Sequence, residues 1–201
     1  MSLSITTVFD FSCPYCYLAW GFIRKTKQKD AITAEWLTWQ IHPDVPKEGS
    51  DIRDVVPSVN LEERRQKLNT LGAPVGLAPG NKVFVPNTRL ALEAVEFARA
   101  HHKLQEWMDA VFQASFAAER NIGDLAVIVD LVQGIGLDGA QLRQALESGR
   151  YTNILVEHDQ FCAKRQVEWV PTIFVGNDKI LEGAFTFEDF EKVLYNLAGN
   201  N

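Results

Sequence analysis

The sequence predicts an α/β fold that is interrupted by an all-helical subdomain. Three observations lead to this prediction. A strand–helix–strand pattern opens the chain, a series of amphipathic helices fills its middle, and a β-hairpin followed by a helix ends it. We therefore expect one α/β domain made of residues 1–46 and 151–201, separated along the chain by a helical insertion at residues 47–150.

The N-terminal unit is predicted from two apolar runs with a helical run between them. Residues 5–11 are apolar and β-branched at their start, which is typical of a buried strand. Residues 17–30 carry apolar side chains at helical spacing, with lysines and arginines crowding the C-terminal half, where cations suit the helix dipole. Residues 34–41 alternate and predict a second strand. A strand–helix–strand unit of this length favours parallel neighbours.

The middle of the chain is predicted to be helical. Residues 61–71 form one helix, whose charged residues are interpreted as a solvated face. Four amphipathic helices with short loops follow and indicate a small helical subdomain. Caps support their boundaries: Asn87 or Thr88 begins the first, Asp124 begins the helix at 125–133, and Asp138 begins the helix at 139–148.

The C-terminal unit begins with a helix at residues 151–166, which places Cys162 on its buried face and His158 beside it. A hairpin follows, with strands at 172–175 and 179–181. Pro171 directly precedes a buried strand, where it has no N–H to donate. A proline at the first position of the strand, in a cis peptide bond, resolves this conflict. Thr186 then begins the last helix with a pattern that resembles a capping box.

Composition excludes several classes of partner. The net charge is −6, from 20 basic and 26 acidic residues, and no basic stripe is present, so nucleic acid is not an expected partner. No apolar run approaches the ~20 residues that a membrane span needs. The first eleven residues lack a basic region and a long apolar segment, which predicts no secretory signal and a cytoplasmic protein.

Cys13 and Cys16 are separated by two residues at the junction of the first strand and the first helix. Pro14 fits the first helical position, so that Cys13 falls at the N-cap. There the helix dipole and the free amides of the first turn, including that of Tyr15, favour an anion; in other CxxC sites such placement lowers a cysteine pKa from about 8.5 to roughly 3.5–7. We therefore expect Cys13 to attack as a thiolate and Cys16 to resolve the product.

A zinc site is the alternative interpretation of two closely spaced cysteines. A structural zinc site normally has four ligands, usually as a second CxxC or an HxxxH pair. The chain has three cysteines and four histidines, and the only other close pair is the adjacent His101 and His102. We expect no metal, and interpret Cys13 and Cys16 as a redox pair.

Five motifs occur along the chain in this order: residues 9–17 (FDFSCPYCY), Pro43-Asp44, Pro86-Asn87-Thr88, Val170-Pro171-Thr172 and Gly183-Ala184. In residues and in order, they resemble the DsbA-like family, especially its FrnE-like branch of thiol–disulfide oxidoreductases. The resemblance implies a thioredoxin-like fold with a helical insertion. It also implies that Cys13 attacks, Cys16 resolves, and Pro171 is a cis-proline beside them.

The resemblance further implies that the backbone of Val170 pairs with an extended substrate strand. Two positions depart from the family pattern, because Gln166 and Trp169 stand where members often carry glycine. The indole of Trp169 is expected to narrow the peptide groove or to stack on a small substrate. The dipeptide Pro14-Tyr15 is the one typical of glutaredoxins and favours an intermediate redox potential.

The leading hypothesis is a protein-disulfide oxidoreductase or isomerase that exchanges disulfides with a protein or a small-molecule thiol. No bound cofactor is expected, and glutathione or a partner thiol is expected to exchange with the cysteine pair. The alternative is a glutathione-dependent enzyme similar to 2-hydroxychromene-2-carboxylate isomerases and kappa-class glutathione transferases. It is favoured by a possible small-molecule pocket built from aromatic residues, which are Tyr15, Tyr17, Trp20 and Trp169. A third hypothesis is a non-catalytic binding module that kept the fold.

Overall fold

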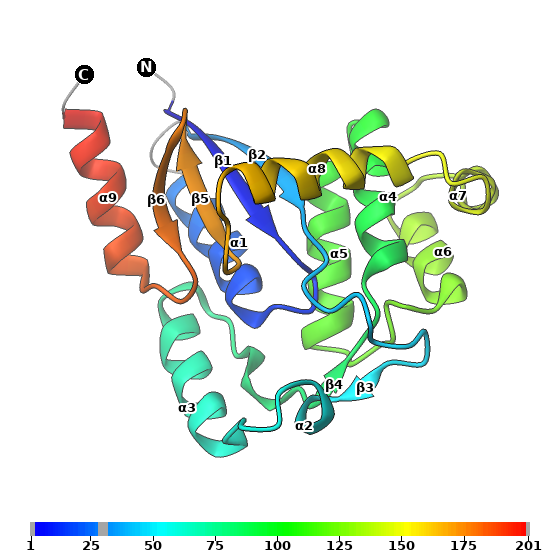
Figure 1. The fold of residues 1–201 in the computed structure, drawn as a ribbon, viewed down its shortest axis with the longest axis horizontal. Helices are drawn as coiled ribbons and strands as arrows, with labels where there is room; N and C mark the ends of the chain where they lie inside the picture. The colour runs from blue at the N-terminus through cyan, green and yellow to red at the C-terminus, as the bar shows by residue number, and fades with distance from the viewer. Residues whose placement is uncertain (1–2, 28–31, 200–201) are drawn as a thin grey trace.

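The computed structural model of the protein describes residues 3–27 and 32–199, which form a mixed α/β fold around a four-stranded sheet (Figure 1). The strand order is β2-β1-β5-β6. The strands are β1 (Leu3–Phe9), β2 (Ile32–Thr38), β5 (Thr172–Val175) and β6 (Asp178–Glu182). β1 runs parallel to β2 and antiparallel to β5, and β6 runs antiparallel to β5. The predicted N-terminal unit and the predicted C-terminal hairpin therefore join in one sheet.

Helices cover this sheet on both faces. In Figure 1, α8 (Thr152–Lys164) crosses the front of the strands, and α1 (Pro14–Lys27), which connects β1 to β2, lies behind them. The last helix, α9 (Phe187–Gly199), packs on α1. At this contact the ring of Phe22 lies 5.4 Å from that of Phe187. The predicted parallel pairing across the first crossover is confirmed.

The insertion contains most of the remaining helices. They are α2 (Ile52–Val55), α3 (Leu61–Gly72), α4 (Arg89–Ala100), α5 (Leu104–Phe116), α6 (Leu125–Gly134) and α7 (Gly139–Glu147), with 3-10 turns η1 (Ala73–Val75) and η2 (Pro79–Asn81). The predicted series of four helices is confirmed as α4 to α7. Asp124 and Asp138 cap α6 and α7 by accepting amide hydrogen bonds from the first turn of each helix.

A short second sheet in the insertion was not predicted. β3 (Ser50–Asp51) pairs antiparallel with β4 (Phe84–Val85). Gly49 makes this pairing possible: its φ is +84°, and a Cβ atom there would lie only 2.1 Å from the ring of Phe84. The insertion is therefore helical with one small β-ribbon, rather than all-helical.

The first elements begin earlier than predicted. β1 covers residues 3–9 instead of 5–11, because the carboxylate of Asp10 accepts the backbone N–H of Ser12 at 2.6 Å and turns the chain. α1 then begins at Pro14, which is the predicted first helical residue, three residues before the predicted run at 17–30. β2 covers residues 32–38 instead of 34–41. Residues 28–30 of the predicted first helix lie outside the described residues.

One large hydrophobic cluster spans the sheet and the insertion. Its aromatic centre joins Phe9 and Phe11 at the end of β1 to Phe112 of α5. The ring of Phe11 lies 4.9 Å from that of Phe112, and Tyr17 stacks on Phe112 at 5.2 Å. The segment that leads from β1 into α1 is therefore anchored in the core, which fixes the position of the two cysteines.

Candidate active site

The two cysteines lie at the start of α1, where the sequence predicted them. Cys13 directly precedes Pro14, and its carbonyl oxygen accepts the N–H of Cys16 at 3.1 Å and that of Tyr17 at 3.3 Å. Only 5% of Cys13 is exposed, and Cys16 is fully buried. Both are free thiols in the structure. Their surroundings differ, because Cys13 lines a cleft and Cys16 does not.

Cys13 faces the segment that leads into β5. Its Sγ donates a hydrogen bond to the carbonyl oxygen of Val170 at 3.4 Å, across 157 residues of sequence. The peptide bond between Val170 and Pro171 is cis, as the sequence predicted. The sequence motifs at residues 13–16 and 170–172 therefore meet at one point in space.

The pKa of the Cys16 thiol is raised well above its ordinary value. Burial is the largest cause, followed by the hydrogen bond and the charge of the neighbouring Cys13, and the charge of Asp10 adds to the effect. Cys16 is consequently a protonated thiol at neutral pH, which is the form expected of a resolving cysteine before it reacts.

Asp10 is a site residue that the sequence analysis missed. It is fully buried beneath the turn before Cys13, and its carboxyl group accepts from the amide and hydroxyl of Ser12, the amide of Ile41 and the hydroxyl of Thr88. Burial raises its pKa, although these hydrogen bonds act in the opposite direction. Asp10 thus joins the end of β1, the chain after β2 and the start of α4.

A buried lysine supports the same turn from the insertion. The ammonium group of Lys82 donates to the hydroxyl of Ser115, which in turn donates to the carbonyl oxygen of Phe11 at 3.3 Å. Lys82 is 4% exposed, and burial is the main reason why its pKa falls to about 7. The charge of Arg64 lowers this pKa further, whereas that of Asp10 raises it.

A cleft of about 810 Å³ opens beside Cys13. Its walls come from the α1 start, the segment after β2, α2, α3 and the segment before β5. Three aromatic residues line it, namely Tyr15, Trp39 and Trp169. The sequence analysis expected Tyr17 and Trp20 there as well, and this expectation is wrong: they line a separate depression of about 350 Å³. Trp39 takes part instead, because β2 ends one residue before it.

Arg64 of α3 also lines this cleft, although the sequence analysis assigned it to a solvated face. Its guanidinium donates to the carbonyl oxygens of Gly80 and Lys82, at 3.2 and 3.0 Å. Burial lowers its pKa, while the charges of Tyr15 and Cys13 raise it. The periodicity of α3 gave no sign of this role, because the role depends on the loop at residues 79–82.

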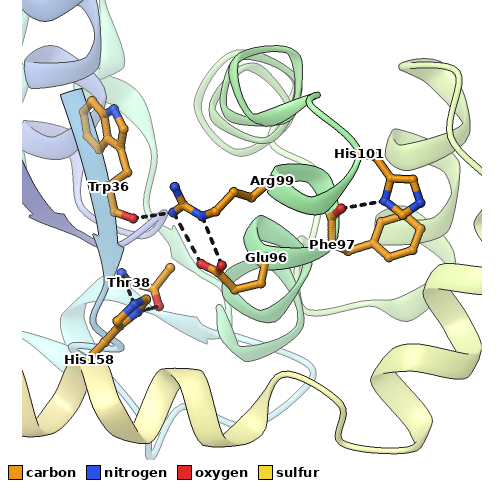
Figure 2. A network of polar contacts seen from close by, with 7 residues as sticks. All are labelled: Trp36, Thr38, Glu96, Phe97, Arg99, His101 and His158. Carbon is orange, nitrogen blue, oxygen red and sulfur yellow. Dashed lines mark hydrogen bonds and ion pairs between the residues drawn. The ribbon is translucent and has the colours of Figure 1, made fainter. Parts of the chain in front are cut away.

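His42 lines the cleft, whereas Cys162, His101 and His158 lie outside it. Cys162 is buried in α8, as predicted, and burial raises its pKa to about 12. Figure 2 shows that His158 accepts the backbone N–H of Thr38 at 3.2 Å, while His101 contacts the carbonyl oxygen of Phe97. Within residues 3–27 and 32–199, no three His, Cys, Asp or Glu side chains are grouped so that they could hold a metal ion.

Membrane insertion has no support among the described helices. None of them combines the length and the apolar character that a bilayer crossing requires.

Comparison with known proteins places these features in a family. The sequence profile of the DSBA-like thioredoxin domain matches residues 4–195. The Bacillus subtilis protein YwbO, described as uncharacterized, is 27% identical over 201 residues, which covers 96% of each chain.

Solved structures show the same fold at low sequence identity. A probable DsbA oxidoreductase from Streptomyces coelicolor has a TM-score of 0.86 at 20% identity, covering 99% of this chain and 91% of that one. A 2-hydroxychromene-2-carboxylate isomerase has a TM-score of 0.74 at 17% identity, covering 98% and 95%. The cytosolic disulfide reductase DsbM from Pseudomonas aeruginosa, solved with GSH, has a TM-score of 0.69 at 12% identity, covering 98% of both chains.

Proposed function

The chain belongs to the family of DSBA-like thioredoxin domains, and on that premise we propose that it catalyses thiol–disulfide exchange through Cys13 and Cys16. The observation that carries this proposal is the unequal placement of the two sulfurs. Cys13 lines the cleft beside the Val170 carbonyl, whereas Cys16 is buried behind it with a raised pKa. One sulfur is placed to meet a substrate, and the other is shielded until the first has reacted.

The reaction proceeds in two exchange steps. The thiolate of Cys13 attacks one sulfur of a substrate disulfide; a new S–S bond forms, the old one breaks, and the leaving thiolate takes up a proton. Cys16 then loses its proton and attacks the Cys13 sulfur, which releases the second substrate thiol. The substrate has gained two electrons and the protein holds a Cys13–Cys16 disulfide. The reverse sequence oxidises a dithiol.

The substrate is a protein or a small-molecule disulfide that enters the cleft beside Cys13. Extended substrates pair with the backbone at Val170, and Trp169 contacts the groups that flank their cysteine. A thiol such as glutathione, or a partner protein's dithiol, returns the oxidised pair to the reduced state. This cycle suits a FrnE-like enzyme of the reducing cytoplasm.

Trapping of mixed disulfides tests this function. A Cys16→Ser variant lacks the resolving sulfur, so we expect it to accumulate covalent adducts with substrate that a reductant releases, as seen on a non-reducing gel. Cys13→Ser is expected to trap nothing. Cys162→Ser provides the matched control, because it removes a buried cysteine away from the cleft. Equal adduct levels in the Cys16→Ser and Cys13→Ser proteins would refute the mechanism.

A glutathione-dependent isomerase or transferase is the second candidate. The lining of the cleft favours it: three aromatic side chains lie with the cations Arg64 and Lys67, and the volume of about 810 Å³ is within the range of about 300–1,000 Å³ of small-molecule sites. Such an enzyme activates the thiol of bound glutathione and does not need a cysteine pair. A double variant with Cys13→Ser and Cys16→Ser that keeps its activity and binds glutathione would establish this candidate over the first.

A further inference from the structure

The segment before Pro171 is held from the side of β6 by a single carboxylate. Oε1 of Glu182 accepts the backbone N–H of Glu168 at 2.8 Å and that of Trp169 at 3.2 Å. The hydroxyl oxygen of Thr172 lies 3.3 Å from the same carboxylate oxygen. Glu182 lies directly opposite Thr172 in the β5–β6 register, so the pairing of the two strands fixes the position of this carboxylate.

Lys179 lies three residues before Glu182 on the same strand and completes the arrangement. Its ammonium group donates to Oε2 of Glu182 at 2.8 Å and to the carbonyl oxygen of Gln166 at 2.7 Å. Gln166 has a φ of +52°, in the left-handed region that favours glycine. The lysine therefore stabilises a backbone conformation that this sequence does not favour at position 166. We call Lys179 and Glu182 the β6 clasp.

Next to the residues that the β6 clasp holds, the carbonyl group of Val170 faces Cys13. The N–H of Trp169 is occupied by Glu182, and its carbonyl oxygen accepts the hydroxyl of Thr172. The carbonyl oxygen of Val170, the next residue, instead faces the Cys13 thiol at 3.4 Å. The Trp169 side chain is 68% exposed at the edge of the cleft. Because the clasp holds residues 168 and 169 in place, it also holds the Val170 carbonyl and the Trp169 indole in place.

We propose that Lys179 and Glu182 are positioning residues, which hold the Val170 carbonyl against Cys13 and Trp169 over the cleft, and so set thiol reactivity and substrate docking together. The effect on substrate docking rests on the proposed thiol–disulfide exchange. The effect on the Cys13 thiol does not, and it can be measured without any substrate.

Loss of the β6 clasp has two measurable effects. Releasing the segment moves the Val170 carbonyl oxygen away from Sγ of Cys13, so the sulfur becomes easier for an alkylating reagent to reach. The same release disorders the backbone on which a substrate disulfide docks. Cys13 is therefore alkylated faster and yet reacts more slowly with disulfides.

Glu182→Ala is the main test variant, in a Cys162→Ser background. We expect three results: faster hydrogen exchange of the Glu168 and Trp169 amides, faster alkylation of Cys13 at a fixed pH, and disulfide exchange slowed roughly ten- to hundredfold. Glu182→Gln keeps an oxygen that accepts the two amides and is expected to restore most of the rate. Lys179→Ala is expected to shift all three readouts in the same directions by smaller amounts.

Glu188→Ala is the matched control, because Glu188 forms an ion pair of the same 2.8 Å length with Lys192 on α9. It is expected to behave as the parent protein. The inference is overturned if Glu182→Ala keeps the amide protection and the alkylation rate of this control, or if alkylation and exchange both slow in a folded variant. If the parent protein itself exchanges no disulfides, the proposed function fails, while the amide and alkylation readouts still decide the positioning role.

Discussion

At the scale of single residues, two cysteines three positions apart have different chemical surroundings. Cys13 lines a cleft and donates to a backbone carbonyl, whereas Cys16 is enclosed by the core and by Asp10. The difference follows from the helix: a residue at the N-cap points out of the first turn, and a residue one turn later lies on its buried face. This asymmetry is what the proposed exchange reaction requires of an attacking and a resolving cysteine.

Cys162 is predicted to be inert in the folded protein. Its pKa of about 12 leaves about one thiolate in ten thousand at pH 8, and the side chain is 1% exposed. We expect native alkylation followed by mass spectrometry to label Cys13 within minutes and Cys162 only after denaturation. Rapid labelling of Cys162 in the native protein would show that α8 does not pack as described.

Asp10 is predicted to support the turn that carries Cys13. Replacing it with alanine leaves the partly buried amides of Ser12 and Ile41 without their acceptor, and should cost about 2–4 kcal/mol of unfolding free energy, measured by chemical denaturation. Asp138→Ala is the matched comparison, because Asp138 also accepts two amides but is exposed. That loss should be about 1 kcal/mol. Equal losses in the two variants would contradict a special role for Asp10.

At the scale of elements, the sequence predicted what local chemistry determines. Thr186 and Asp189 were expected to cap the last helix, and each accepts the backbone N–H of the other. The CxxC motif and the proline of residue 171 were likewise recognised from neighbouring residues alone. Arg64 and Glu182 were not recognised, because their roles depend on loops that reach them from elsewhere in the chain. Side chains that act through distant backbone groups leave no periodic signal in a sequence.

The contact between α8 and β2 is predicted to weaken in acid. His158 accepts the Thr38 amide, and its pKa is lowered, chiefly by burial (Figure 2). Its contribution to stability is therefore complete above the unfolded value of about 6.5, and is lost as the pH falls below that value through the lowered folded pKa. The free energy of unfolding in urea should fall between pH 7 and pH 5 in the parent protein. In a His158→Leu variant this fall should be smaller by about 1 kcal/mol.

The exposed His102 gives the control for this measurement. His102→Gln should follow the pH dependence of the parent protein. If His158→Leu and His102→Gln have the same pH dependence, then protonation of His158 does not weaken the α8–β2 contact.

At the scale of the whole molecule, one hydrophobic core contains residues from both predicted parts of the chain. The division between residues 1–46 with 151–201 and residues 47–150 was inferred from sequence and stays a prediction. The core cluster nevertheless includes Phe9 of β1, Phe112 of α5 and Leu142 of α7. From the insertion, Thr88 donates to Asp10, and Ser115, which accepts from Lys82, donates to the carbonyl oxygen of Phe11 in the cysteine turn. The active site is therefore built from both parts of the chain.

This continuity predicts that the sheet and the insertion unfold together. Phe112→Ala removes the ring that contacts Phe11 and Tyr17, and should cost about 3–5 kcal/mol. Because the core is shared, the unfolding midpoints from tryptophan fluorescence and from far-ultraviolet circular dichroism should fall together and remain coincident. The fluorescence reports Trp36 in β2 as well as Trp107 in α5. Two separated transitions in the variant would instead show that the insertion is an independent folding unit, and that the site's support from Lys82 and Thr88 can be lost while the sheet stays folded.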